Sequence, residues 1–183
     1  YNIVNDLDSD VFNLFQVVMN QKDELEKAFY MMPIHSDLLD YWKENEETEP
    51  IKKALRFLFL SNFTLNGTGT SIRHSVSSGC GGVKDFKDKF NNKLNETFNL
   101  LYDVNFTCFD FKKFITKLSF MKDGRNDEAK TFIYNDPPYQ NTQDNYSNSF
   151  VKQDLIDLIE TNIATGCKFA ISEFDTDVVL ELA

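Results

Sequence analysis

The residues with the clearest chemical potential are Asp136-Pro137-Pro138-Tyr139, here called the tip, which follow the strand-forming run Thr131 to Tyr134. The two prolines have a fixed φ and no N–H, and each biases the residue before it towards extended geometry. The tip is therefore stiff and cannot continue a sheet ladder. It would present a carboxylate, backbone carbonyls and an aromatic ring at the end of a buried strand. We expect a functional site there.

Two further acids follow strand-like runs. Asp6 comes after the opening strand-like residues and just before a helix whose N-cap we expect at Asp8 or Ser9. Asp110 follows a strand predicted over residues 104–108 and precedes a short helix. An acid at such a strand-to-helix turn can accept both hydroxyls of a ribose. Capping of the helix by an exposed acid explains Asp6 equally well on local evidence.

The elements that must position these acids alternate between helix and strand. Apolar stripes at helical spacing predict a long helical block from residue 11 to about 101. Strands that end in acids and alternate with helices predict a parallel α/β sheet with its chemistry at the carboxyl edge. Because the helical block is too long for a crossover, we expect an α/β domain over 1–10 and 102–183 with a helical insertion over 11–101. The predicted helices are 21–31, 36–46, 50–61, 85–101 and a segment around 155–163 that ends at Gly166. The predicted strands are 104–108, 131–134 and 168–172. Residues 122–130 are predicted as a solvated connection.

Two polar loops could contact a ligand. The segment 62–84 holds five of the seven glycines, and it also contains Arg73. It suits either a phosphate cradle or an element that reads a DNA groove, although the preceding strand of a phosphate loop is missing. The segment 140–149 could act as a lid whose aromatic residues Tyr146 and Phe150 close over a ligand. A plain loop anchored by Phe150 is an equal alternative.

Composition narrows the class of protein. A hydrophobic fraction of 42% with 18 Phe residues indicates a globular protein, and no apolar run is long enough to span a membrane. Three scattered cysteines and the lack of a signal-peptide pattern predict a cytoplasmic location. The two isolated histidines give no reason to expect a metal site. A formal net charge of −10 argues against a nucleic-acid partner, because phosphate neutralisation needs clustered Lys and Arg.

The motifs, taken in order, resemble those of the Dam-like (D12 class) N6-adenine DNA methyltransferases over nearly the whole chain. Asp136 to Tyr139 looks like the catalytic tetrapeptide, Asn5-Asp6 like the ribose-binding turn, and residues 106–111 like the motif that holds the cofactor adenine. Residues 59–67, which end in an Asn-Gly pair, are similar to the start of the target-recognition hairpin. Residues 170–176 resemble the strand and turn that follow the catalytic motif.

The resemblance implies a Rossmann-like sheet that depends on S-adenosylmethionine, with a mostly helical target-recognition insertion. It implies methyl transfer to an adenine flipped out of double-stranded DNA, and a cognate restriction endonuclease is a conceivable partner. A non-catalytic remnant or nucleic-acid-binding module is the main alternative, and RNA or protein-amide methylation on the same fold is a weaker one. The implied residues are Asp136, Pro137, Pro138 and Tyr139 for catalysis, Asp6, Asp110 and Phe111 for the cofactor, and Asn66, Gly67, Thr68, Thr70, Arg73, Tyr146 and Phe150 for DNA.

The chain departs from the family pattern in two places. The glycine-rich first strand turn has no counterpart, so we expect residues upstream of Tyr1, or a separate polypeptide, to supply it. Family N-termini tend to be basic, and for this reason the charge of −10 need not exclude DNA. Thr70 stands where relatives that read GATC have a base-reading Arg, which leaves the recognition sequence open.

Overall fold

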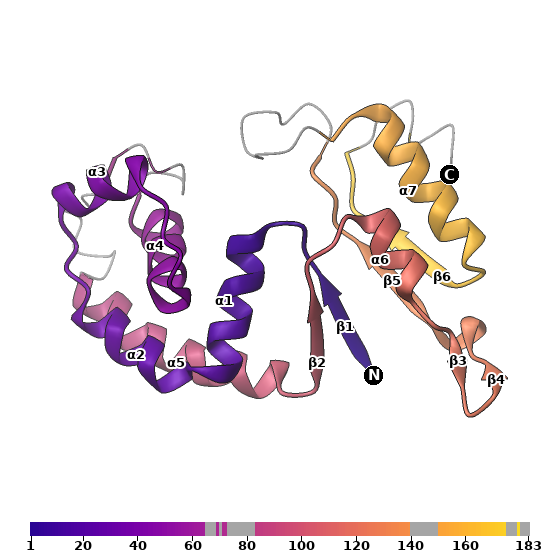
Figure 1. The fold of residues 1–183 in the computed structure, drawn as a ribbon, viewed down its shortest axis with the longest axis horizontal. Coiled ribbons are helices and arrows are strands. Elements are labelled where there is room, and N and C mark those ends of the chain that lie inside the picture. Colours follow the sequence, from indigo (N-terminus) through magenta and orange to yellow (C-terminus); the bar gives the residue numbers. More distant parts are fainter. Residues whose placement is uncertain (65–68, 70, 73–82, 140–149, 175–178, 180–183) are drawn as a thin grey trace. The chain divides into compact units, whose positions relative to one another are not determined.

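Helices and short strands make up the computed structural model, which describes residues 1–64, 69, 71–72, 83–139, 150–174 and 179 (Figure 1). The chain divides into two compact units, Tyr1–Phe109 and Asp110–Ala183. The first contains β1 (Asn2–Asn5), α1 (Ser9–Asn20), α2 (Lys22–Met31), α3 (Ser36–Glu44), α4 (Pro50–Phe63), α5 (Val83–Leu101) and β2 (Val104–Thr107). The second contains α6 (Phe111–Lys117), β3 (Met121–Lys122), β4 (Arg125–Asn126), the 3-10 helix η2 (Glu128–Lys130), β5 (Phe132–Asn135), α7 (Lys152–Ala164) and β6 (Lys168–Ile171).

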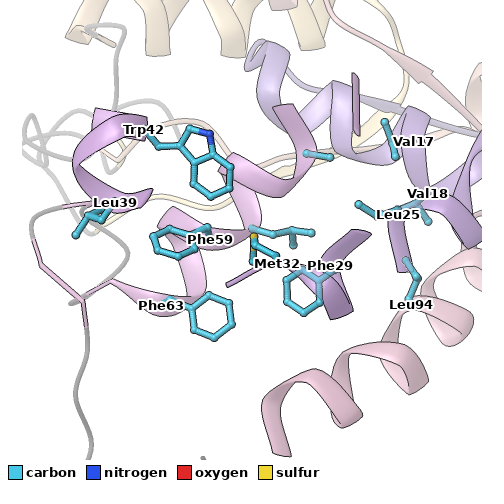
Figure 2. Packing of buried hydrophobic residues seen from close by; sticks show 12 residues of the cluster. Val17, Val18, Leu25, Phe29, Met32, Leu39, Trp42, Phe59, Phe63 and Leu94 are labelled. Carbon is cyan, nitrogen blue, oxygen red and sulfur yellow. The ribbon is translucent and has the colours of Figure 1, made fainter. Parts of the chain in front are cut away.

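The helices of the first unit enclose an aromatic core (Figure 2). The rings of Phe29 and Phe90 stack with centroids 3.8 Å apart and join α2 to α5. Trp42 meets Phe59 edge-on at 5.2 Å, which joins α3 to α4. The predicted helical block is thus confirmed as a packed body. The buried residues of this core are Val17, Val18, Leu25, Phe29, Met32, Leu39, Trp42, Ala54, Leu58, Phe59, Phe63 and Leu94.

Local sequence explains where the helices begin. The side chain of Asp8 accepts from the amide of Asp10 at 2.7 Å, so Asp8 is the N-cap of α1, one of the two residues predicted. Pro50 occupies the first turn of α4, where its missing N–H costs nothing, and Glu49 caps that helix. Gly166, with φ +73°, follows the end of α7, as its sequence position predicts.

The strands predicted to carry the acids run parallel. β1 pairs with β2, from Asn2 opposite Val104 to Asn5 opposite Thr107. β5 pairs with β6, and Asn135 lies opposite Ile171. The mixture of helices and parallel strands is consistent with an α/β methyltransferase. The expected single Rossmann-like sheet is not observed, because the parallel strands of the described residues form two separate pairs. The domain division expected from the sequence, with 1–10 grouped with 102–183, stays a prediction.

The stretch expected to be only a solvated connection contains regular structure. β3 and β4 form a short antiparallel hairpin, with Met121 opposite Asn126. Its turn holds Asp123 at φ 52° and Gly124 at φ 73°. Asp-Gly favours this two-residue hairpin turn because both residues tolerate a positive φ. That signal outweighed the polar composition on which the prediction rested. Over the described parts of both units, no helix is both long and apolar enough to cross a membrane.

Candidate active site

The strand that leads into the tip is held in place through its buried face. Side chains along β5 alternate in exposure, and Asn135 lies on the half-buried face. Its amide nitrogen donates to the Asn162 side chain of α7 at 3.3 Å and to the backbone carbonyl of Ala170 in β6 at 3.2 Å. Asn162 is fully buried and donates to the carbonyl of Leu158 at 2.8 Å. The residue immediately before Asp136 is therefore anchored to both a helix and the neighbouring strand.

Hydroxyl groups gather beside the tip. The side chains of Asp136 and Ser172 both act on the pKa of the Tyr139 hydroxyl. Ser172 in turn is hydrogen-bonded through its hydroxyl to the hydroxyl of Tyr134. Its backbone N–H donates to the carbonyl of Asn135 at 2.9 Å, which continues the β5–β6 ladder by one step. The Tyr139 ring also meets Phe174 edge-on at 4.9 Å.

The carboxylate of Asp136 affects the pKa of the Tyr139 hydroxyl. This carboxylate raises the pKa of Tyr139 above its usual range, and partial burial of the phenol acts in the same direction. Ser172 acts in the opposite direction and lowers this pKa. Tyr139 therefore keeps its proton at neutral pH and can act as a hydrogen-bond donor. The predicted catalytic residues Asp136 and Tyr139 therefore interact electrostatically.

Asp6 lies in the first unit, at the turn between β1 and α1. One of its carboxylate oxygens accepts from the amide of Asp8 at 2.8 Å, and its own N–H donates to the Thr107 carbonyl at 3.1 Å. Asn5 holds this turn beside the end of β2. Its side-chain amide donates to the Phe109 carbonyl at 2.9 Å and accepts from the Phe109 N–H at 3.0 Å. Asp6 thus supports its own turn on a strand end that Asn5 fixes, but the cap of α1 is Asp8, so the interpretation of Asp6 as the helix cap is wrong.

Asp110 and Phe111 lie at the start of α6. The Asp110 carboxylate caps this helix by accepting from the amide of Lys112 at 3.0 Å. The Phe111 ring meets Phe150 edge-on at 6.5 Å, so a residue expected to bind the cofactor touches one expected to close over the substrate. Lys112 also forms an ion pair with Asp157 of α7, which raises the pKa of the lysine and lowers that of the acid. This ion pair joins α6, which begins at Phe111, to α7, which begins two residues after Phe150.

The expected recognition loop is described only at its base. Thr64, 1% exposed, pairs with Ile72 in an antiparallel bridge, and its hydroxyl accepts from the amide of Gly69 at 2.9 Å. At the far end of the loop, the Lys87 ammonium donates to the carbonyls of Tyr30 and Met32, and burial lowers its pKa. The predicted DNA contacts Asn66, Gly67, Thr68, Thr70, Arg73 and Tyr146 lie outside the described residues.

Sequence reasoning did not predict the contacts that anchor the strand ends. Asn5, Asn162 and Ser172 each anchor a strand end, but an isolated Asn or Ser carries no sequence signal for the partner it will meet. Asn5 offers the best hint, because Asn at the end of a strand often bonds to nearby backbone. Asp6 and Asp136 lie in different units, so the pocket expected to join them stays a prediction. Within the described residues, no group of three or more His, Cys, Asp or Glu could hold a metal ion.

Comparison with known proteins adds one finding to this geometry. No curated protein matches the chain. The family model for the D12 class N6 adenine-specific DNA methyltransferases matches residues 2–180, which include both parallel strand pairs, the helical block and the tip. The chain therefore belongs to the D12 class N6 adenine-specific DNA methyltransferase family.

Proposed function

We propose that the protein is a site-specific DNA methyltransferase that transfers a methyl group from S-adenosylmethionine to the N6 amine of a flipped-out adenine. The proposal rests on one observation above all. At the end of β5, the Asp136 carboxylate lies near enough to Tyr139 of the tip to raise the pKa of the tyrosine hydroxyl. A single bound adenine could therefore meet an acceptor for its amine and an aromatic ring for its face.

The chemistry accounts for both groups. The exocyclic amine of adenine is a poor nucleophile, because its lone pair is delocalised into the ring. Two acceptors for its N–H bonds would turn the lone pair towards the methyl group. In this proposal the Asp136 carboxylate and the Pro137 carbonyl are those acceptors, and Pro138 keeps the segment extended. Tyr139 stacks on the base, which offsets part of the few kcal/mol that base flipping costs.

The residues proposed for the cofactor suit its chemistry. Asp6 is half-buried, and its second carboxylate oxygen makes no hydrogen bond to the described residues, so it could accept from a ribose hydroxyl. The Phe111 ring, which meets Phe150 edge-on, could pack against one face of the cofactor's adenine ring. When bound, S-adenosylmethionine supplies the methyl group on a sulfonium. Asp110 is also proposed to contact the cofactor.

Recognition of DNA is assigned to the segment 62–84 and to Tyr146. Thr64 fixes the base of this segment through the bridge to Ile72, and the buried helical core supports it. We further propose a role in a restriction-modification system or a phage or orphan methylation system, with a restriction endonuclease as the partner in the first case. The protein would act in the cytoplasm.

The test combines binding with methyl transfer. Calorimetry of the full-length protein with S-adenosylmethionine should give measurable heat, and radiolabelled methyl should pass to duplex DNA in preference to RNA or protein. Asp136→Ala should retain cofactor binding but lose transfer, because it removes an acceptor for the amine. Absence of binding heat would favour a non-catalytic remnant. Undiminished transfer by the Asp136→Ala variant would refute the assigned mechanism.

A further inference from the structure

The ring of Phe111 takes its orientation from neighbouring side chains and not from the helix in which it lies. A helical side chain normally lies over the turn that precedes it, but Phe111 is the first residue of α6 and has no preceding turn. The Lys112 ammonium lies 5.5 Å from the centroid of the ring, within the range of a cation–π contact. Phe150, which precedes α7, meets the ring edge-on at 6.5 Å. These two contacts therefore restrict the direction in which the ring points.

Lys112 is held in turn by a side chain of α7. Its ammonium forms an ion pair and donates a hydrogen bond to one carboxylate oxygen of Asp157, Oδ2. The other oxygen, Oδ1, accepts from the side-chain amide of Gln153, one turn earlier in α7, at 2.7 Å. Both oxygens of the acid are therefore bound, and its side chain is 26% exposed against 50% for that of Lys112. Asp157 is the better held of the two partners, so it sets the place of the ammonium.

The second partner of the lysine distinguishes this ion pair from an ordinary one. An exposed ion pair usually stabilises a protein little. Here the same ammonium is also attracted to the quadrupole of the Phe111 ring, so the position that Asp157 gives to Lys112 acts on the ring as well. The pKa of Lys112 is raised above its ordinary value, chiefly by the hydrogen bond to Asp157, and the ammonium therefore stays charged at neutral pH.

We propose that Lys112 is a positioning residue: Asp157 holds its ammonium, and the ammonium orients the Phe111 ring for the adenine of S-adenosylmethionine. The inference rests on the proposed function, in which Phe111 contacts the cofactor. A ring that is already oriented loses less conformational freedom when the adenine binds, so the cofactor binds more tightly. The ribose separates the adenine from the sulfonium that carries the methyl group. The effect should therefore fall on cofactor binding and leave the transfer step unchanged.

Calorimetry of the full-length protein with S-adenosylmethionine measures this effect. Lys112→Met keeps an unbranched side chain but removes the charge, and it should raise the cofactor Kd about three- to fivefold. Lys112→Arg keeps a cation that can both pair with a carboxylate and stack on a ring, so its Kd should lie within about twofold of the wild-type value. Lys130→Met is the matched control, because Lys130 pairs with Asp127 at 3.1 Å but its side chain is 82% exposed, and it should leave the Kd unchanged. An equal Kd for the wild type and Lys112→Met would overturn the proposal.

Two further comparisons separate positioning from general destabilisation. At a saturating concentration of cofactor, Lys112→Met should methylate DNA at a rate within about twofold of the wild type, because only binding depends on the ring orientation. A rate that stays lower than this at saturation would contradict the assigned role. The double variant Lys112→Met/Asp157→Asn should bind the cofactor no more weakly than Lys112→Met, because both changes break the same interaction. Additive losses would contradict the dependence of Lys112 on Asp157.

The last measurement needs neither cofactor nor activity. Incorporation of 4-fluorophenylalanine gives 19F NMR signals for the 18 Phe residues, and Phe111→Leu assigns the signal of Phe111. Lys112→Met should shift this signal, because it removes the cation from the ring, whereas Lys130→Met should not. An unmoved Phe111 signal in Lys112→Met would refute the contact between the ammonium and the ring. If the signal moves but the wild-type protein binds no S-adenosylmethionine, the proposed function fails while the orientation of Phe111 by Lys112 stands.

Discussion

Substitution of Asn162 by Ala should loosen the strand that carries the tip. Asn162 is fully buried, and its side chain makes three hydrogen bonds: two with Asn135 at 3.3 and 3.5 Å and one with the Leu158 carbonyl at 2.8 Å. A net contribution of about 0.5–1.5 kcal/mol per bond, with the two longer bonds at the low end, predicts that the free energy of opening falls by about 1.5–2.5 kcal/mol. The substitution also leaves a polar oxygen of Asn135 without this partner inside the unit.

Native-state hydrogen exchange followed by mass spectrometry measures this loss where it occurs. The backbone amides of β5 and β6 should exchange about twelvefold to sixtyfold faster in Asn162→Ala, from the conversion of about 1.4 kcal/mol per factor of ten. Asn20→Ala is a matched control, because exposed Asn20 also donates to the carbonyl four residues earlier, at 2.9 Å, in another helix. Equal effects of the two substitutions on amide exchange in β5 and β6 would contradict the anchoring role of Asn162.

Three further predictions concern other parts of the site. Asn5→Ala should speed exchange in the turn after β1 by about tenfold, because it removes the side-chain clamp to the end of β2, and no change would contradict that role. Lys112 lowers the pKa of Asp157 below its ordinary value of 3.8. The stabilisation from this interaction is complete above pH 3.8, and it is lost as the pH falls through the lowered pKa. Urea unfolding below pH 4 should therefore depend less on pH in Asp157→Asn than in the wild type. Thr64→Val, which removes the hydroxyl that accepts from Gly69, should weaken DNA binding several-fold without changing S-adenosylmethionine affinity, while Thr64→Ser should preserve both. Equal DNA affinity of the Val and Ser variants would contradict this role for Thr64.

Local signals in the sequence predicted most of the individual elements. The strand-forming run Thr131 to Tyr134 and the two prolines after Asp136 predicted the strand end at the tip, and β5 spans Phe132–Asn135, because strand propensity and fixed proline geometry act over a few residues. Pro50 and Gly166 marked a helix start and a helix end for the same reason. The D12 class itself was identified from motifs in the correct order, and the match over residues 2–180 confirms it.

Contacts between distant residues were not predictable in this way. Asn162 and Asn135 are 27 positions apart, and Tyr134 and Ser172 are 38 apart. Neither pair has a spacing or composition that distinguishes it from other polar residues. Their partnership depends on how α7 and β6 return to β5, which is a tertiary property. The β3–β4 hairpin shows a different limitation, because its Asp123-Gly124 signal was present and polar composition was given more weight.

Identification of the methylated nucleoside tests the central claim most directly. Full-length protein is incubated with unmethylated duplex DNA and S-adenosylmethionine that carries a deuterated methyl group, and the DNA is then digested to nucleosides for mass spectrometry. We expect deuterated N6-methyldeoxyadenosine with the wild type. With Asp136→Ala, its yield should fall at least about a hundredfold, because an orienting group at the reacting amine is removed. Label on cytosine, label on no nucleoside, or an equal yield from Asp136→Ala would contradict that claim.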